Sequence, residues 1–257
     1  MKDGLLSRLT RLSRNLLKVS TRVSGQLVFI DSDLPSSALN VVFGVPDSPE
    51  DVETITRICQ PRNLPATWWL PTDVATPAAW WLAECGWTIK DVLIGMALNM
   101  GDGYDIPAPP PTGLVIKPCD SFERVRDMAL VIGSLYQGDR VREGALIRNM
   151  IERRADVIVK PEEGFRAWVA YFEDTPVSTV NMHYSGYSAD VSRLATQPNF
   201  RHRGFAQALF LHVLTEARAL GCRLMTLQAS SKGVRIYTKL GFVPVNQFVL
   251  WSNLSLL

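Results

Sequence analysis

Residues 201–221 read RHRGFAQALFLHVLTEARALG, a basic cluster followed by a glycine and a long amphipathic segment. The first backbone N–H groups of a helix lack partners inside it and, with the helix dipole, attract anions. Gly204 has no side chain, so a bulky anion can approach the backbone closely. Arg201 and Arg203 add charge-assisted hydrogen bonds. This stretch therefore predicts a phosphate-binding turn at the mouth of a helix that ends at Gly221.

The elements around this helix predict a mixed α/β domain. A strand and a helix fit 114–136, with Asp120 as N-cap and Glu123 completing a capping box. The remaining expected elements are a helix at 143–153, a hairpin at 165–186 turning at 173–176, a strand at 189–197 ended by Pro198, the helix after Gly204, a strand at 223–229, a short helix at 231–241 and a last strand at 242–252. The order β-α-α-β-β-β-α-β-α-β predicts an α/β (α+β) domain with one mixed central sheet flanked by helices.

A proline-rich segment, GDGYDIPAPPPTG at 101–113, is the clearest linker in the chain. We therefore expect two domains, a smaller one at 1–112 and a larger one at 113–257.

The first 23 residues are basic and carry leucines at helical spacing, which predicts an amphipathic helix. A surface helix docked on the protein body, a membrane-surface helix and an organellar presequence all fit this pattern. A secretory signal does not, because arginines interrupt the apolar core.

Composition narrows the function classes. The chain is 47% hydrophobic and 20% charged, with a net charge of +2, so nothing global demands nucleic acid or a membrane partner. The four cysteines form no CxxC pair and only three histidines are present, which disfavours a metal site. Wide cysteine spacing is typical of reduced thiols in the cytoplasm, and no apolar run is long enough to span a membrane.

Two motifs together resemble the GNAT (Gcn5-related N-acetyltransferase) family. The family's phosphate motif, Arg/Gln-x-x-Gly-x-Gly/Ala, is matched by RHRGFA at 201–206. Its C-terminal signature, Tyr-x-Lys-Leu-Gly-Phe, is matched by YTKLGF at 237–242. One helix and one strand are expected between them, as in the family, and the resemblance covers about 114–251. The spacing of Ser230, Gly233 and Tyr237 predicts that one helix face carries all three.

The resemblance implies acetyl-CoA as co-substrate and a GNAT acyltransferase fold. The pyrophosphate would sit on the N–H groups of residues 203–206, and the pantetheine arm would lie along a bulged strand at 190–197. A backbone N–H near Leu194 would polarise the thioester carbonyl. Ser230 stands where many relatives carry Asn, and it still offers a hydroxyl to a ligand amide. The implied donor-binding residues are Leu194, Ala195, Thr196, Arg201, His202, Arg203, Gly204, Phe205, Ala206, Ser230 and Gly233.

The implied reaction is N-acetylation of a primary amine of a small molecule or peptide by direct attack in a ternary complex. No enzyme nucleophile and no metal are needed. Tyr237 matches the family's general acid, which protonates or stabilises the departing thiolate. Asp190 and His183 are candidates for the general base, and a water chain is a third possibility. The acceptor and the oligomeric state stay open.

Residues 38–100 show a weak sequence similarity to the second part of the chain. PATWWL at 65–70, TPAAWWLAECGW at 76–87 and DVLIGMALNM at 91–100 predict a strand, a short helix and a strand. This resembles the degenerate N-terminal half of tandem GNAT proteins. It lacks the phosphate motif and has no Tyr before Gly86, so we expect it to bind no coenzyme A. The four tryptophans, Trp68, Trp69, Trp80 and Trp81, fit either core packing or an aromatic wall of the acceptor cleft.

Two alternatives remain at this stage. One is a non-catalytic acyl-CoA-binding module of the same fold; Tyr237 argues against it, because a pure binder needs no acid for a thiolate. The other is an acyl or aminoacyl transferase with a larger donor, and the RHRGFA turn argues for a pyrophosphate instead.

Overall fold

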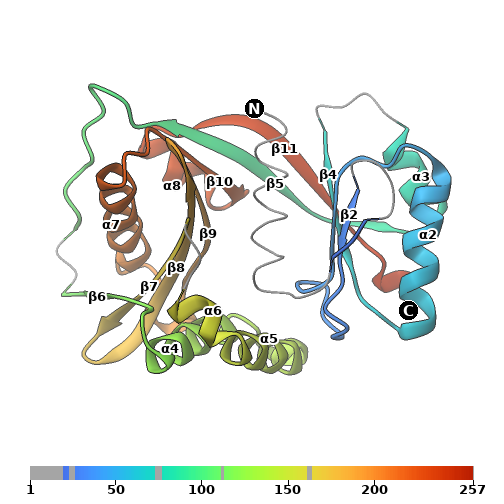
Figure 1. Ribbon diagram of the computed structural model, residues 1–257, viewed down its shortest axis with the longest axis horizontal. Helices are drawn as coiled ribbons and strands as arrows, with labels where there is room; N and C mark the ends of the chain where they lie inside the picture. The colour runs from blue at the N-terminus through green and yellow to red at the C-terminus, as the bar shows by residue number, and fades with distance from the viewer. Residues whose placement is uncertain (1–19, 23–26, 73–76, 111–112, 161–163, 257) are drawn as a thin grey trace. The chain divides into compact units, whose positions relative to one another are not determined.

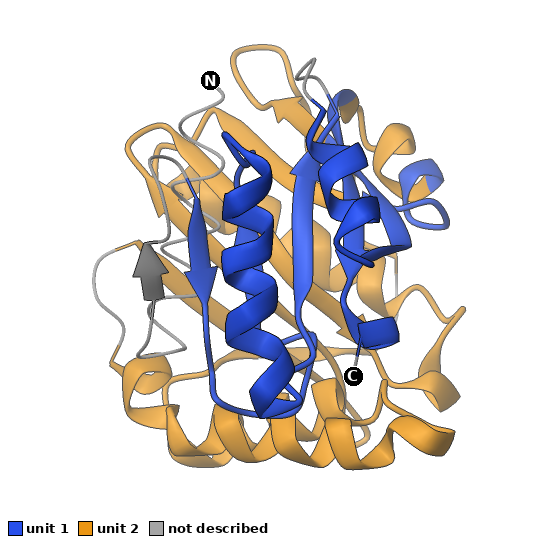
Figure 2. Ribbon diagram, turned by 90° about the vertical axis from the view of Figure 1, so that its right-hand side faces the viewer, with its two compact units in different colours: residues 1–95, 229–235, 244–257 blue, residues 96–228, 236–243 orange. Residues whose placement is uncertain are grey.

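The computed structural model describes residues 20–22, 27–72, 77–110, 113–160 and 164–256 (Figure 1). These residues form two compact units, coloured separately in Figure 2. Unit 1 comprises residues 1–95, 229–235 and 244–257, and unit 2 comprises residues 96–228 and 236–243. Residues 113–257 therefore do not form one unit by themselves, because the C-terminal strand belongs to unit 1; the domain boundary at 112 stays a prediction.

Unit 1 is a small sheet with helices. Its strands lie in the order β1 (Ser20–Arg22), β2 (Val28–Ile30), β3 (Val41–Phe43), β4 (Thr67–Pro71) and β11 (Val243–Ser252). All neighbouring pairs are antiparallel except β3 and β4, which run parallel. Helix α2 (Pro49–Cys59) connects that parallel pair, and α3 (Ala78–Glu84) follows β4. Strand β5 (Thr88–Asn99) begins in unit 1 and ends in unit 2.

Tryptophans organise the core of unit 1. Trp68 is fully buried and meets Trp87 edge to face, with ring centroids 5.7 Å apart. The indole N–H of Trp87 donates to the Thr56 hydroxyl at 2.9 Å, so the buried polar atom is paired. Trp69 packs between two phenylalanines. Core packing is thus confirmed for Trp68, whereas Trp80 is 63% exposed.

Unit 2 is a larger mixed sheet covered on both faces. Its strands lie in the order β10 (Leu224–Ser230), β9 (Ser188–Thr196), β8 (Thr175–Ser185), β7 (Phe165–Phe172) and β6 (Val115–Pro118). Only β9 and β10 run parallel, and α7 (Phe205–Ala219) connects them. The other helices are α4 (Phe122–Gly133), α5 (Val141–Arg153), α6 (Ala155–Val159) and α8 (Val234–Lys239).

Helices α4 and α7 cover opposite faces of this sheet. The Tyr171 hydroxyl donates to Asp127 of α4 at 2.6 Å, and the next residue, Phe172, packs on Phe205 of α7 with centroids 5.2 Å apart. Consecutive strand residues point to opposite faces. The buried side of α7 includes Leu209, Val213 and Ala217, as its apolar stripe predicted.

The predicted fold class, a mixed α/β sheet flanked by helices, is confirmed. The hairpin turn is confirmed at Glu173 and Asp174, which both adopt positive φ. The predicted N-cap Asp120 is wrong: Ser121 caps α4 by accepting from the Arg124 N–H, while Asp120 pairs with the Arg124 guanidinium. Helix α6 was not predicted.

The predicted amphipathic helix at 1–23 lies mostly outside the described residues. Its end is wrong, because Ser20–Arg22 pair with β2 as strand β1. No helix in the described part of the chain is long and apolar enough to cross a membrane.

Candidate active site

The start of α7 is built as an anion cradle. Gly204 is the N-cap, with φ 80° and ψ −1° in the left-handed region that glycine adopts without strain. His202, two residues earlier, also has positive φ. Such turns aim successive backbone N–H groups at one point. Because the helix begins at Phe205, its first N–H groups have no intrahelical partner.

Three basic side chains surround this turn, and all are exposed. The Arg203 guanidinium lies over the Phe200 ring, 5.3 Å from its centroid. Arg201 donates through Nε to the Thr196 carbonyl at 3.3 Å, which leaves its terminal nitrogens available. The turn therefore combines backbone donors with positive charge, the arrangement that a pyrophosphate requires.

Strand β9 carries the bulge expected beside a donor arm. Its register with β8 shifts between Thr179 and Asn181, and Arg193 has φ 52°. The predicted residues Leu194, Ala195 and Thr196 follow the bulge directly. The Ala195 carbonyl accepts from the Ser178 hydroxyl at 2.6 Å, so side-chain bonds anchor this strand segment.

Asp190 sits in a buried polar row on the same strand. It is fully buried and lies opposite His183 in the β8–β9 register. Its carboxylate accepts from the Thr226 hydroxyl at 2.8 Å and from the Gln228 amide at 3.4 Å. The structure thus brings the two predicted base candidates together and fixes Asp190 by neutral donors from β10.

Tyr237 lies in α8 within an aromatic cluster. Its ring meets Phe210 and Phe242 edge to face, with centroids 5.3 and 5.8 Å apart. Phe210 belongs to the second turn of α7, so Tyr237 lies beside the helix that Gly204 begins. Burial raises the pKa of the Tyr237 phenol to about 12. At neutral pH the phenol therefore keeps its proton.

The single helix face predicted for Ser230, Gly233 and Tyr237 is wrong. Ser230 is the last residue of β10, and Gly233 lies in the turn before α8, its N–H donating to the Ser230 carbonyl at 2.8 Å. Strand β10 runs further than the sequence indicated, so only Tyr237 is helical.

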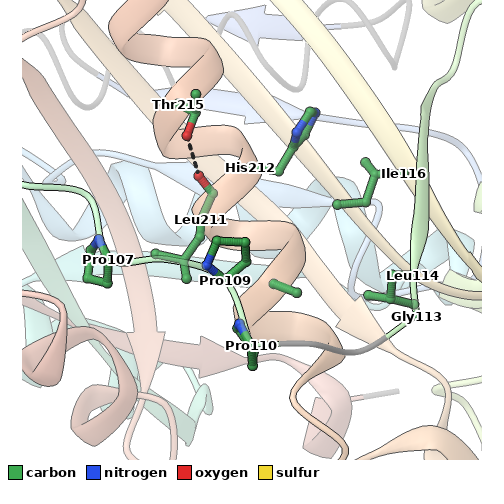
Figure 3. Close-up of a pocket in the computed structure, with 10 residues that line it drawn as sticks. Pro107, Pro109, Pro110, Gly113, Leu114, Ile116, Leu211, His212 and Thr215 are labelled. Carbon is green, nitrogen blue, oxygen red and sulfur yellow. Dashed lines mark hydrogen bonds between the residues drawn. The ribbon is translucent and has the colours of Figure 1, made fainter.

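A pocket of about 340 Å³ opens elsewhere in unit 2, between the proline-rich segment, β6 and α7 (Figure 3). Pro107, Pro109 and Pro110 line one side, and Leu211, His212 and Thr215 line the other. Burial lowers the pKa of His212, and nearby Glu216 opposes this. None of the predicted donor or catalytic residues lines this pocket.

The acetyltransferase (GNAT) family model matches residues 163–244, the segment that holds β9, the α7 turn and Tyr237. The protein carries a GNAT domain. No curated protein matches the sequence.

Solved structures extend the likeness to the fold of nearly the whole chain. A GCN5-related N-acetyltransferase from Kribbella flavida is 21% identical with a TM-score of 0.66, and 94% of each chain is covered. One from Sphaerobacter thermophilus is 14% identical, with a TM-score of 0.56 over 86% of this chain and 74% of that one. A tandem GNAT protein from the clavulanic acid biosynthesis pathway is 15% identical, with a TM-score of 0.55 over 88% and 77%. At these identities the likeness is one of fold.

The N-terminal half also folds as a GNAT-like domain. Its β3–α2–β4–α3 order repeats the β9–α7–β10–α8 order of the GNAT domain, and the first helix of each set, α2 or α7, connects a parallel strand pair. The structural counterpart of the RHRGFA turn is therefore the loop before α2.

Sequence reasoning missed a second group in unit 2. Arg193 lies at the β9 bulge, and Tyr136 lies in the loop between α4 and α5. The available signal was an arginine among the short side chains of the run VSRLAT, on a strand expected to be half-buried.

Proposed function

We propose that the GNAT domain transfers an acetyl group from acetyl-CoA to a primary amine of a small molecule or peptide. The observation that carries this proposal is the α7 turn, where Gly204 in the left-handed region and three exposed basic residues surround unpaired helix N–H groups. The bulge in β9 supports it, because a bulged strand leaves room for the pantetheine arm beside Leu194, Ala195 and Thr196.

In the proposed reaction the neutral amine nitrogen attacks the thioester carbonyl carbon. A bond forms between nitrogen and carbon, the carbon–sulfur bond breaks, and coenzyme A leaves as a thiolate. The amine proton passes to a base, for which Asp190 is our candidate, through water where contact is not direct. Tyr237 gives its proton to the thiolate. A backbone N–H near Leu194 stabilises the oxyanion.

The protonated Tyr237 favours an enzyme over a non-catalytic acyl-CoA-binding module. A buried phenol with a pKa of about 12 is a hydrogen-bond donor throughout the neutral range. A binding module has no thiolate to protonate. We also propose that the protein is located in the cytoplasm. The four free cysteines support this, because thiols stay reduced in that compartment.

The experiment is titration calorimetry of acetyl-CoA against the parent, Gly204→Glu and Gly221→Glu. Glu at 204 places a side chain and a negative charge in the turn, so we expect affinity to fall at least about 100-fold. Gly221 has the same left-handed φ, 83°, at the other end of α7, and no atom lies within 4 Å of an added Cβ. It controls for backbone strain.

Release of free coenzyme A in the presence of a panel of amines then tests catalysis. Equal affinity of the parent and Gly204→Glu would place the donor elsewhere. Tight binding without thiol release by any amine would favour the binding module.

A further inference from the structure

Arg193 is a cation that no residue in the described part of the chain neutralises. Its side chain is half-buried at the β9 bulge, yet in the described part of the chain it makes no ion pair and no hydrogen bond. An unpaired guanidinium in partly desolvated surroundings is costly, and proteins keep such groups mainly where a ligand completes them. The residue is only partly buried, which leaves part of its surface open to a ligand.

The surroundings of Arg193 provide an aromatic neighbour in place of a carboxylate. Burial lowers the pKa of Arg193, and Tyr136 partly restores it. The nearby carboxylate of Glu143 is bound to Arg140 at 2.8 Å, and Arg140 also stacks over the Tyr136 ring at 4.7 Å. The other carboxylate, that of Asp190 on β9, accepts from Thr226 and Gln228. These two carboxylates are thus held by residues other than Arg193.

In the described part of the chain, two further buried polar atoms beside Arg193 have no hydrogen-bond partner. Ser192 precedes it, and Asn181 lies opposite Ser192 in the β8–β9 register. Asn181 is 1% exposed, and its Oδ1 and the Ser192 hydroxyl are both buried without a hydrogen bond. Unsatisfied buried polar atoms are rare in native proteins and call for a partner. Their clustering at the bulge is an observation independent of the arginine.

We propose that Arg193 binds a carboxylate of the amine acceptor, which makes the acceptor class amino acids or peptides with a carboxylate near the reacting amine. This rests on the proposed acetyl transfer. The planar guanidinium fork matches a carboxylate in two parallel hydrogen bonds. Arg193 immediately precedes residues 194–196, where the donor arm is proposed to lie, so an acceptor held there carries its amine toward the thioester. Polyamines and aminoglycosides would be repelled.

The test compares matched amines in the coenzyme A release assay. Each amino acid is paired with its α-amide, and O-phosphoethanolamine is paired with ethanolamine to separate phosphate from carboxylate recognition. We expect the parent to prefer the carboxylate member in kcat/KM. Arg193→Met should reduce that preference about 10- to 100-fold, the usual loss of a charge-assisted hydrogen bond. Arg193→Lys should restore part of it.

Controls separate this inference from the proposed function. Arg142→Met removes the same charge from the exposed surface of α5 and should leave the preference unchanged. Acetyl-CoA affinity of Arg193→Met should equal that of the parent, so a failed donor site is recognised separately. Preference for amides, ethanolamine or phosphoethanolamine over carboxylates overturns the inference.

The melting temperature of Arg193→Met tests whether Arg193 is unpaired in the ligand-free protein, and this measurement needs no acceptor. If Arg193 is held for a ligand, replacing it by Met removes an unpaired charge, and Tm of the ligand-free protein should stay equal or rise. If Arg193 is instead paired within the protein, Arg193→Met lowers Tm, and that result contradicts the inference.

Discussion

Tyr237 has a packing role and a proposed catalytic role, and the two belong to different parts of its side chain. Its ring fills space between Phe210 and Phe242, while its hydroxyl is the only part that the proposed reaction uses. Tyr237→Phe keeps the ring contacts, so Tm and coenzyme A affinity should stay near the parent values. Turnover should fall about 10²- to 10⁴-fold, as when a positioned general acid is lost. Single-turnover rates with an identified acceptor measure this.

Tyr187→Phe is the matched control, because Tyr187 is 65% exposed and outside the proposed mechanism.

The raised pKa of Tyr237 also makes the stability of the protein depend on pH. The folded pKa of about 12 exceeds the reference value of about 10, so the folded state gains stability that is complete below pH 10 and lost as pH rises toward 12. Tyr237→Phe should lose less stability in that window, by no more than about 1.4 kcal/mol per pH unit. Full turnover in Tyr237→Phe with chemistry limiting would leave Tyr237 a packing residue.

At the scale of elements, the α4–α5 pair positions the loop that carries Tyr136. The two helices cross at Gly133 and Gly144, where a Cβ on Gly144 would lie 2.7 Å from the Gly133 carbonyl oxygen and 2.8 Å from the Tyr136 Cβ. Backbone cannot yield cheaply at such distances. This contact therefore fixes where the α4–α5 loop begins.

Gly144→Ala tests this crossing. Alanine gains about 1 kcal/mol of helix propensity over glycine, but forcing the helices apart costs about 1–3 kcal/mol. We expect Tm to fall by a few degrees and the acceptor KM to rise, with acetyl-CoA affinity unchanged. Gly138→Ala, in the same loop, is the control. Its added Cβ has no atom within 4 Å, so the substitution adds backbone strain at positive φ but no steric clash. A higher Tm in Gly144→Ala would show that the helices are not held by this contact.

The same scale shows what the sequence predicts and where it fails. The α7 helix and the 173–174 turn were predictable because apolar period and turn chemistry are local signals. The start of α8 was not, since Ser230 joins β10 through pairing that spacing alone does not reveal. A role for Arg193 could not be predicted, because its position follows from the β9 bulge, and the bulge depends on the β8–β9 register. For the same reason the Asn181–Ser192 pair was invisible in the sequence.

At the scale of the whole molecule, two units of similar element order have opposite charge at the matching helix. The α2 N-terminus carries Glu50 and Asp51 in its first turn, whereas the α7 N-terminus follows Arg201, His202 and Arg203. Asp51 also accepts from the N–H groups of Asp47 and Ser48 at 2.8 and 3.2 Å. Unit 1 thus places a carboxylate at the start of α2, where it repels a pyrophosphate and occupies the N–H groups of the two residues before the helix.

We therefore predict one coenzyme A per chain. Calorimetric titration of the full protein should give a stoichiometry of one, and Gly204→Glu should abolish all of the binding heat rather than half. Two results would contradict this: a stoichiometry of two for the parent, or a remaining site in Gly204→Glu. Asp51→Asn serves as the internal check, because it weakens the carboxylate cap without opening a glycine turn at α2. It should lower stability by about 0.5–2 kcal/mol and still yield one site, because residues 44–48 before α2 include no basic side chain.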